Sequence, residues 1–328
     1  MNKKQKILGV LFVVLASMCY GITPILSNTA LKGGLPADFL TRVFGSAPAF
    51  AALDPANAIP NESVVGFGMA IACVLSLIPC LFGKISLKVT GRQALEMAGF
   101  GGGGFTATML LISYSYLCIP AGTTIVLNFT YPILVALISA LFFKEKLRLP
   151  TVFALILAVV GVALISGLGS GGSVLGNNPA LGVPLALLSG LAYAVYFLAG
   201  RHSSYAKLPG SVTNVYITGS AAVFCFAAAL ITGRFRFPPT WFLWLVLLSS
   251  GILGYIIGLR LLLAGIRLLG SVTASALNTL EPVFASITSV IVFGEAMGGM
   301  KMLGAGLVLL GALISIISMR KAESGMRN

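Results

Sequence analysis

The chain has 328 residues, of which 58% are hydrophobic and 9% are charged, with a mean hydropathy of +1.02. Because a soluble domain carries about 25% charged residues, this composition excludes a soluble globular protein and indicates an integral membrane protein. The net charge of +13 comes with one histidine, no HExxH and no nucleic-acid-reading motif. We therefore expect no nucleic-acid partner, no metal, no cofactor and no enzyme activity.

Ten apolar segments follow one another along the chain, and each is long enough to cross a bilayer as a helix. None alternates polar and apolar residues as a barrel strand would, and backbone groups in lipid must bond within their own segment. The predicted fold class is an all-α integral membrane protein with ten transmembrane helices, at roughly 7–31, 63–83, 95–117, 121–143, 148–167, 180–200, 212–232, 240–265, 271–293 and 302–319.

The fourth of these segments is repeated in the ninth without a gap. Pro132 and Pro282, for example, are 150 positions apart, and the same offset relates Asn128 to Asn278, Ser139 to Ser289, Phe143 to Phe293 and Glu145 to Glu295. Such a match indicates two copies of one structural unit. We place the first repeat at 1–168 and the second at 180–328, joined by a charge-free, turn-rich linker at 169–179.

The first repeat contains an insertion. Tyr20 matches Tyr193 at an offset of 173 rather than 150, so extra residues lie between the first and second helices. We place them at about 39–63, in an outer loop that carries a short interfacial helix. A tolerated loop insertion and a lid over the outer mouth are both consistent with this segment.

The distribution of lysine and arginine predicts the topology. Of the 21 basic residues, those outside the spanning segments fall mostly in the connections on one side, and the opposite side has only Lys32, Arg42, Arg234, Arg236 and Lys301. By the positive-inside rule both termini lie in the cytoplasm, as in a multi-pass protein of the cytoplasmic membrane. Five helices per repeat is an odd number, so the two repeats have inverted orientations, as in many secondary transporters.

Glu281 lies near the middle of the ninth segment. A carboxylate at this depth costs on the order of 3 kcal/mol unless it is protonated, paired or in contact with water. Asn278 lies three residues earlier on the same helix face, and Asn128 and Tyr131 share the equivalent face of the fourth segment. These side chains are candidates for a substrate or proton site. A packing glutamate and a role in folding or assembly are the alternatives.

Three further residues are candidates for this site. Arg260 lies at a depth similar to that of Glu281, and pairing would hold Glu281 ionised, whereas an unpaired Glu281 could carry a proton. Arg260 could instead bind a substrate anion. Tyr20 and Tyr193 are candidates for cavity walls or for packing. The glycines at 101–104 indicate a close helix contact, local flexibility or a hinge.

The sequence resembles the drug/metabolite transporter superfamily, specifically its EamA-type members. The resemblance covers nearly the whole chain and rests on the two matched helices, where Leu280–Ala285 with Phe293–Glu295 looks like the family's ninth helix and Tyr131–Pro132 through Phe143–Glu145 looks like its fourth. It implies a central cavity between the two repeats and alternating access. The insertion and Arg260 depart from the family pattern.

We therefore predict a secondary active transporter of small polar or amphipathic metabolites, amino acids first among them, with the lipid bilayer as partner and a proton or other ion as possible coupling ion. It would be a monomer or a homodimer. The alternatives are an exporter of hydrophobic or cationic drugs and a non-transporting membrane interaction or sensor protein.

Overall fold

The structure is a computed structural model that describes residues 3–46, 48, 50–145, 149–166, 177–293 and 298–324. Nine helices within these ranges are long and apolar enough to cross a membrane, judged by length and composition. A tenth apolar helix, Leu149–Ile165, is shorter. The predicted all-α membrane fold with ten apolar helices is therefore confirmed.

The first five apolar helices and the short helices of the insertion form the first half of the chain. They are α1 (Lys3–Lys32), α2 (Ala37–Phe44), η1 (Pro55–Asn57), α3 (Asn61–Phe82), α4 (Gly91–Glu96) continued by η2 (Met97–Gly103) and α5 (Gly104–Ser115), α6 (Ala121–Asn128), α7 (Tyr131–Phe143) and α8 (Leu149–Ile165).

The second half repeats this order without the insertion. Its elements are α9 (Pro179–His202), α10 (Gly210–Ile231), α11 (Trp241–Ser250) continued by η3 (Gly251–Gly258) and α12 (Leu259–Leu269), α13 (Ser271–Asn278), α14 (Glu281–Phe293) and α15 (Gly299–Ser324). The predicted linker at 169–179 lies mostly outside the described residues, and the exact division into two repeats stays a prediction.

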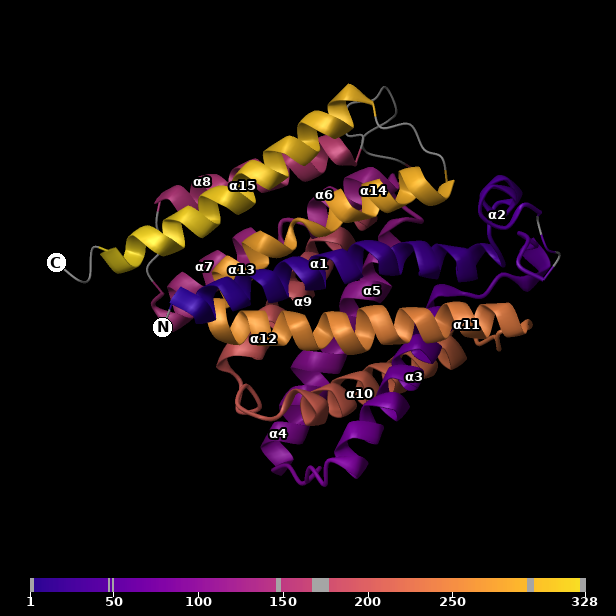
Figure 1. Ribbon diagram of the computed structural model, residues 1–328, viewed down its shortest axis with the longest axis horizontal. Helices are drawn as coiled ribbons and strands as arrows, with labels where there is room; N and C mark the ends of the chain where they lie inside the picture. The colour runs from indigo at the N-terminus through magenta and orange to yellow at the C-terminus, as the bar shows by residue number, and fades with distance from the viewer. Residues whose placement is uncertain are drawn as a thin grey trace.

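The first helix of each half packs against helices of the other half. Helix α1 packs against α12 and α14, and its counterpart α9 packs against α5, α6 and α7. Helix α3 lies along α10 at one end of the molecule and α8 lies along α15 at the other (Figure 1). Each half therefore buries its helices against the other half, and we call the two halves interlocked for this reason.

Two segments with π-helical hydrogen bonding occupy equivalent positions in the halves. They are η2 and η3, and glycines match between them at the repeat offset of 150: Gly101 of η2 with Gly251 of η3, and Gly104, the first residue of α5, with Gly254 of η3. A Cβ atom on Gly102 would lie only 2.8 Å from the backbone N of Ala221 and would also meet the Ser220 side chain of α10. The predicted close helix contact is confirmed, whereas the π-helical turns were not predicted.

The insertion contains the predicted short helix, α2. Arg236, in the connection between α10 and α11, donates hydrogen bonds to the backbone oxygens of Ala58, at 2.9 Å, and Ala56. The ring of Phe50 packs on Trp241 at a centroid distance of 4.8 Å. The insertion is thus fixed to the second half of the chain at the end where α3 begins.

We predict that Gly102→Ala lowers the free energy of unfolding by about 1–3 kcal/mol, because the added methyl group meets the backbone of α10 and overpacks the contact. Thermal unfolding in detergent measures the change. Gly99→Ala is the matched control, since a Cβ on Gly99, in the same π-helical segment, meets no atom within 4 Å. Equal stability of the two variants would contradict the close contact.

Candidate functional site

Two transmembrane helices are broken at repeat-matched positions. In the second half α13 ends at Asn278 and α14 begins at Glu281, and in the first half α6 ends at Asn128 and α7 begins at Tyr131. A proline follows each restart as the second residue of the new helix, and proline has no N–H to continue the hydrogen-bond ladder. Glu281 and Tyr131 are therefore equivalent residues at the start of two half-helices.

A hydrogen-bond network joins the two breaks through Asn278. Its Nδ2 donates to the Tyr131 hydroxyl at 3.1 Å and to Oε2 of Glu281 at 3.3 Å. Its Oδ1 accepts from Ser17 Oγ of α1 at 3.2 Å, and the Tyr131 hydroxyl donates to the backbone oxygen of Ser275 at 3.5 Å. One amide thus fixes the predicted candidates Glu281, Asn278 and Tyr131 in a single cluster built from both halves.

Glu281 differs from its partners in exposure. Asn278 and Tyr131 have no exposed surface, whereas Glu281 is partly exposed. Glu281 is the first residue of α14, where the helix dipole favours negative charge. Among the residues that the structure describes, no lysine, arginine or histidine forms an ion pair with it. The carboxylate can therefore accept a proton or a cationic group from outside the network.

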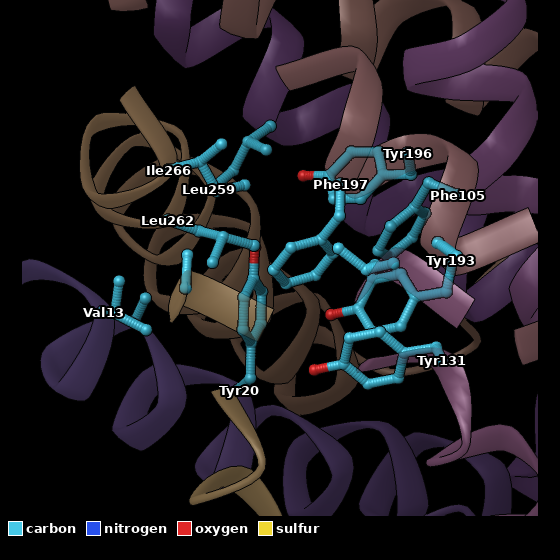
Figure 2. Packing of buried hydrophobic residues seen from close by; sticks show 14 of the residues in the cluster. Val13, Tyr20, Phe105, Tyr131, Tyr193, Tyr196, Phe197, Leu259, Leu262 and Ile266 are labelled. Carbon is cyan, nitrogen blue, oxygen red and sulfur yellow. The ribbon is translucent and has the colours of Figure 1, made fainter. Parts of the chain in front are cut away.

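Aromatic rings surround the network. Tyr131 lies 4.5 Å from Tyr193 and 5.2 Å from Phe197, as centroid distances, and Tyr193 stacks with Tyr196 at 5.8 Å. The hydroxyl groups of Tyr131 and Tyr193 point toward the side on which Tyr20 lies (Figure 2). The predicted wall residues Tyr20 and Tyr193 are thus brought into one cluster with Tyr131.

Helix α1 brings Tyr20 close to Glu281 through the neighbouring residue Gly21. A Cβ atom on Gly21 would lie 3.0 Å from the backbone oxygen of Glu281. The close approach of α1 to the start of α14 therefore requires glycine at position 21. This contact places the tyrosine beside the helix break.

Asn128 belongs to a separate, equivalent pair. Its Nδ2 donates to Ser189 Oγ of α9 at 2.9 Å, and the side chain is buried. In each half the asparagine at the helix break thus bonds a serine in the first helix of the other half, Asn278 with Ser17 and Asn128 with Ser189. No hydrogen bond in the described part of the chain links Asn128 to Glu281, so the two asparagines do not meet in one network as expected.

The predicted pairing of Arg260 with Glu281 is wrong. Both residues are described, and no ion pair joins them. Arg260 lies on the face of α12 that is turned to the start of α10, where its Cγ is 4.0 Å from the Cβ position of Gly210. Similar depth in consecutive helices therefore does not bring the two side chains together, because the helix face decides the neighbour.

Sequence reasoning missed Ser17, Ser189 and Phe197. The two serines lie about one turn before the matched tyrosines, Ser17 before Tyr20 and Ser189 before Tyr193. Residues three or four apart share a helix face. A search for polar residues on the faces of Tyr20 and Tyr193 would therefore have found both serines.

Residues 39–167 and 180–317 each match a family model described as "EamA-like transporter family". Because these two segments cover most of the sequence, the chain belongs to the EamA-like transporter family. The resemblance to EamA-type members of the drug/metabolite transporter superfamily is confirmed, and the family is one of membrane transporters rather than enzymes.

Curated relatives carry transporter names. The chain is 24% identical over 245 residues to an "Uncharacterized transporter" of Clostridium kluyveri, which covers 72% of this chain and 76% of the relative. It is 27% identical over 239 residues to the "Threonine/homoserine exporter RhtA" of Escherichia coli K12. That alignment covers 72% of this chain and 75% of the relative. A crystal structure has the same fold, with a TM-score of 0.72, 17% identity and coverage of 98% of this chain and 99% of the other.

We predict that Tyr131→Phe and Asn278→Ala are coupled in a double-mutant cycle on unfolding by about 0.5–1.5 kcal/mol, the net value of one buried hydrogen bond. Denaturant or thermal unfolding of the four proteins gives the coupling energy. A second cycle of Asn278→Ala with Tyr193→Phe serves as control, because no hydrogen bond joins that pair. Similar coupling in both cycles would show that the Asn278–Tyr131 bond has no specific role.

Proposed function

We propose that the protein is a secondary active transporter that moves small amino compounds, amino acids first among them, across the cytoplasmic membrane by alternating access. The observation that carries this proposal is Glu281, a partly exposed carboxylate at a helix break with no basic partner in the described part of the chain. An intramembrane acid of this kind is favoured only when a proton or a cation joins it. The ammonium group of an amino acid meets that requirement.

The equivalence of Glu281 and Tyr131 supports a substrate with two opposite charges. Each residue begins a half-helix, and Thr130, which precedes α7, makes no side-chain cap. In this proposal the positive end of the α7 dipole attracts a substrate carboxylate, and Glu281 at the start of α14 receives the ammonium group. Asn278, hydrogen-bonded to both residues, keeps the two ends together.

The aromatic cluster adds attraction for the same cation. Tyrosine rings attract an ammonium group by about 0.5–2 kcal/mol when it lies over a ring face. Tyr20, Tyr131 and Tyr193 all lie beside the network. The name of the relative RhtA, a threonine/homoserine exporter, is consistent with a substrate of this class.

Coupling follows from competition at Glu281. A proton and an ammonium group cannot both occupy the same carboxylate, so alternating occupation gives exchange of protons for substrate. In this proposal both termini lie in the cytoplasm, and the protein acts as a monomer or homodimer in which each chain has its own site. An exporter of cationic drugs is the second candidate, since Glu281 and the tyrosines would bind an organic cation without a carboxylate.

We predict that Glu281→Gln reduces proton-driven uptake of labelled threonine or homoserine into proteoliposomes by roughly tenfold or more, because a charge-assisted hydrogen bond worth about 1.5–3 kcal/mol is lost. Asp38→Asn, which removes an exposed carboxylate of α2, is the matched control and should transport normally. A panel of amino acids, matched amines and lipophilic cations separates the two candidates. Transport of the cations alone would favour the drug exporter.

An unchanged rate for Glu281→Gln would contradict the proposed site while leaving the fold intact. Loss of transport together with loss of thermal stability would instead support a packing role. Glu281→Asp keeps the charge, and partial activity in that variant is expected if the carboxylate itself binds substrate. A non-transporting sensor would bind a ligand and show no flux in any variant.

We also predict that Glu281→Cys, in a protein without its five native cysteines, reacts with a membrane-impermeant charged thiol reagent and that substrate slows the reaction. Thr279→Cys, at a position with no exposed surface two residues earlier, should stay unmodified. Modification is measured as a mass increase. Reaction of Glu281→Cys only with a lipid-soluble maleimide would mean that position 281 faces lipid rather than water.

A further inference from the structure

Arg260 and Arg267 have buried guanidinium nitrogens without hydrogen-bond partners. In both residues the unpartnered atoms are Nε and Nη2, which form the side-on fork that arginine uses for bidentate binding of oxyanions. Arg260 and Arg267 are seven residues apart, so they lie on the same face of α12 about two turns from each other. Buried N–H groups that lack partners are costly, and two such forks on one face of a helix require a common explanation.

Both arginines face the segment that leads into α10. Nη1 of Arg267 donates to the backbone oxygen of Leu208 at 2.9 Å, and Cγ of Arg260 lies 4.0 Å from the Cβ position of Gly210. Pro209, the residue before α10, gives this 22-residue helix no side-chain cap. Its first N–H groups therefore add positive potential beside Arg260.

A third unpartnered group lies at the same place. Tyr205 is fully buried in the connection before α10, and its hydroxyl has no hydrogen-bond partner. Its backbone oxygen accepts from the N–H of Leu208, the residue whose own oxygen accepts from Arg267. A buried phenol without a partner is uncommon in folded proteins. Two guanidinium forks, a phenol and an uncapped helix start thus provide hydrogen-bond donors around one short segment.

The acidic residue of this region is already engaged. Glu96 forms an ion pair with Arg92 at 2.8 Å and accepts hydrogen bonds from the backbone N and Oγ of Ser204 at 2.6 and 2.7 Å. No described carboxylate pairs with Arg260 or Arg267. In the described part of the chain the two forks are therefore open to a negatively charged group of another molecule.

We propose that Arg260 and Arg267 form a binding site for a phosphate group at this end of α10 and α12. A phosphate offers more oxygens than a carboxylate and can meet two forks at once. Phosphate can come from the headgroup of an anionic phospholipid or from a phosphorylated solute. Exposed basic residues, Arg201 and Lys207, flank the site and would attract either ligand.

This site is separate from the Glu281 network and does not depend on the proposed transport activity. Arg260 was expected to serve the central site. Its position at Gly210 instead assigns it to the connection between α9 and α10. The site can therefore be tested without a transport assay.

Thermal unfolding of the purified, delipidated protein, followed by tryptophan fluorescence, tests the proposal. The probes are phosphatidylglycerol, diacylglycerol with the same acyl chains, inorganic phosphate and glycerol 3-phosphate. Phosphatidylglycerol should raise the unfolding midpoint of the wild-type protein in a saturable way, whereas diacylglycerol should not. Stabilisation by glycerol 3-phosphate or inorganic phosphate alone would assign the site to a solute.

Arg260→Gln should reduce the apparent affinity for the stabilising phosphate compound roughly tenfold or more, because one charged fork is removed. Arg42→Gln, which removes an exposed charge of α2 in the insertion, away from the site, is the matched control and should bind as the wild type does. Without ligand, Arg260→Gln should unfold at the same or a higher temperature, because two buried N–H groups without partners are gone. A purely structural arginine would lower the midpoint instead, and that result would overturn the proposal.

Arg260→Lys keeps the positive charge and removes the fork, so it should bind more weakly than the wild type even if Arg260→Gln does not fold. Equal stabilisation of the wild type, Arg260→Lys and Arg260→Gln would overturn the proposal. So would the absence of stabilisation by every phosphate compound.

Discussion

Backbone hydrogen bonding in lipid is the constraint on which the centre of this protein depends. A helix that stops in the middle of a membrane leaves N–H and C=O groups that water cannot satisfy. The chain breaks two helices in this way, with Pro132 and Pro282 just after each restart. Neighbouring helices must then surround each break, and Asn278 with Ser17 and Asn128 with Ser189 fix those neighbours in place.

The interlocked halves follow from this constraint. Each break is covered by the first helix of the other half, α1 over α14 and α9 over α6 and α7. The approach is close enough to require Gly21 against the backbone of Glu281. Small residues also allow η2 to lie against α10. The symmetric packing therefore buries both helix breaks. It also encloses the polar side chains that lie at them.

The two helix breaks differ in the residue at which the second half-helix begins. The two breaks have the same asparagine and proline, yet one restarts at Tyr131 and the other at Glu281. Only the second gives a partly exposed acid, and Asn278 bonds to both residues while Asn128 bonds elsewhere. A charged residue in lipid is costly, and this cost is the reason that we propose Glu281 as the site of the cation. The arginines of α12 lie apart from this network, at the connection before α10.

The sequence by itself determined the class of protein, the ten apolar helices, the insertion helix and the importance of the fourth and ninth helices, because composition, apolar length and a constant offset are properties of the chain alone. The tertiary structure decided which side chains meet. It joined Tyr131 to Asn278, gave Asn128 a separate partner, produced the π-helical turns and turned Arg260 away from Glu281. These outcomes depend on which helix faces lie opposite each other, and that follows from the packing of all the helices together.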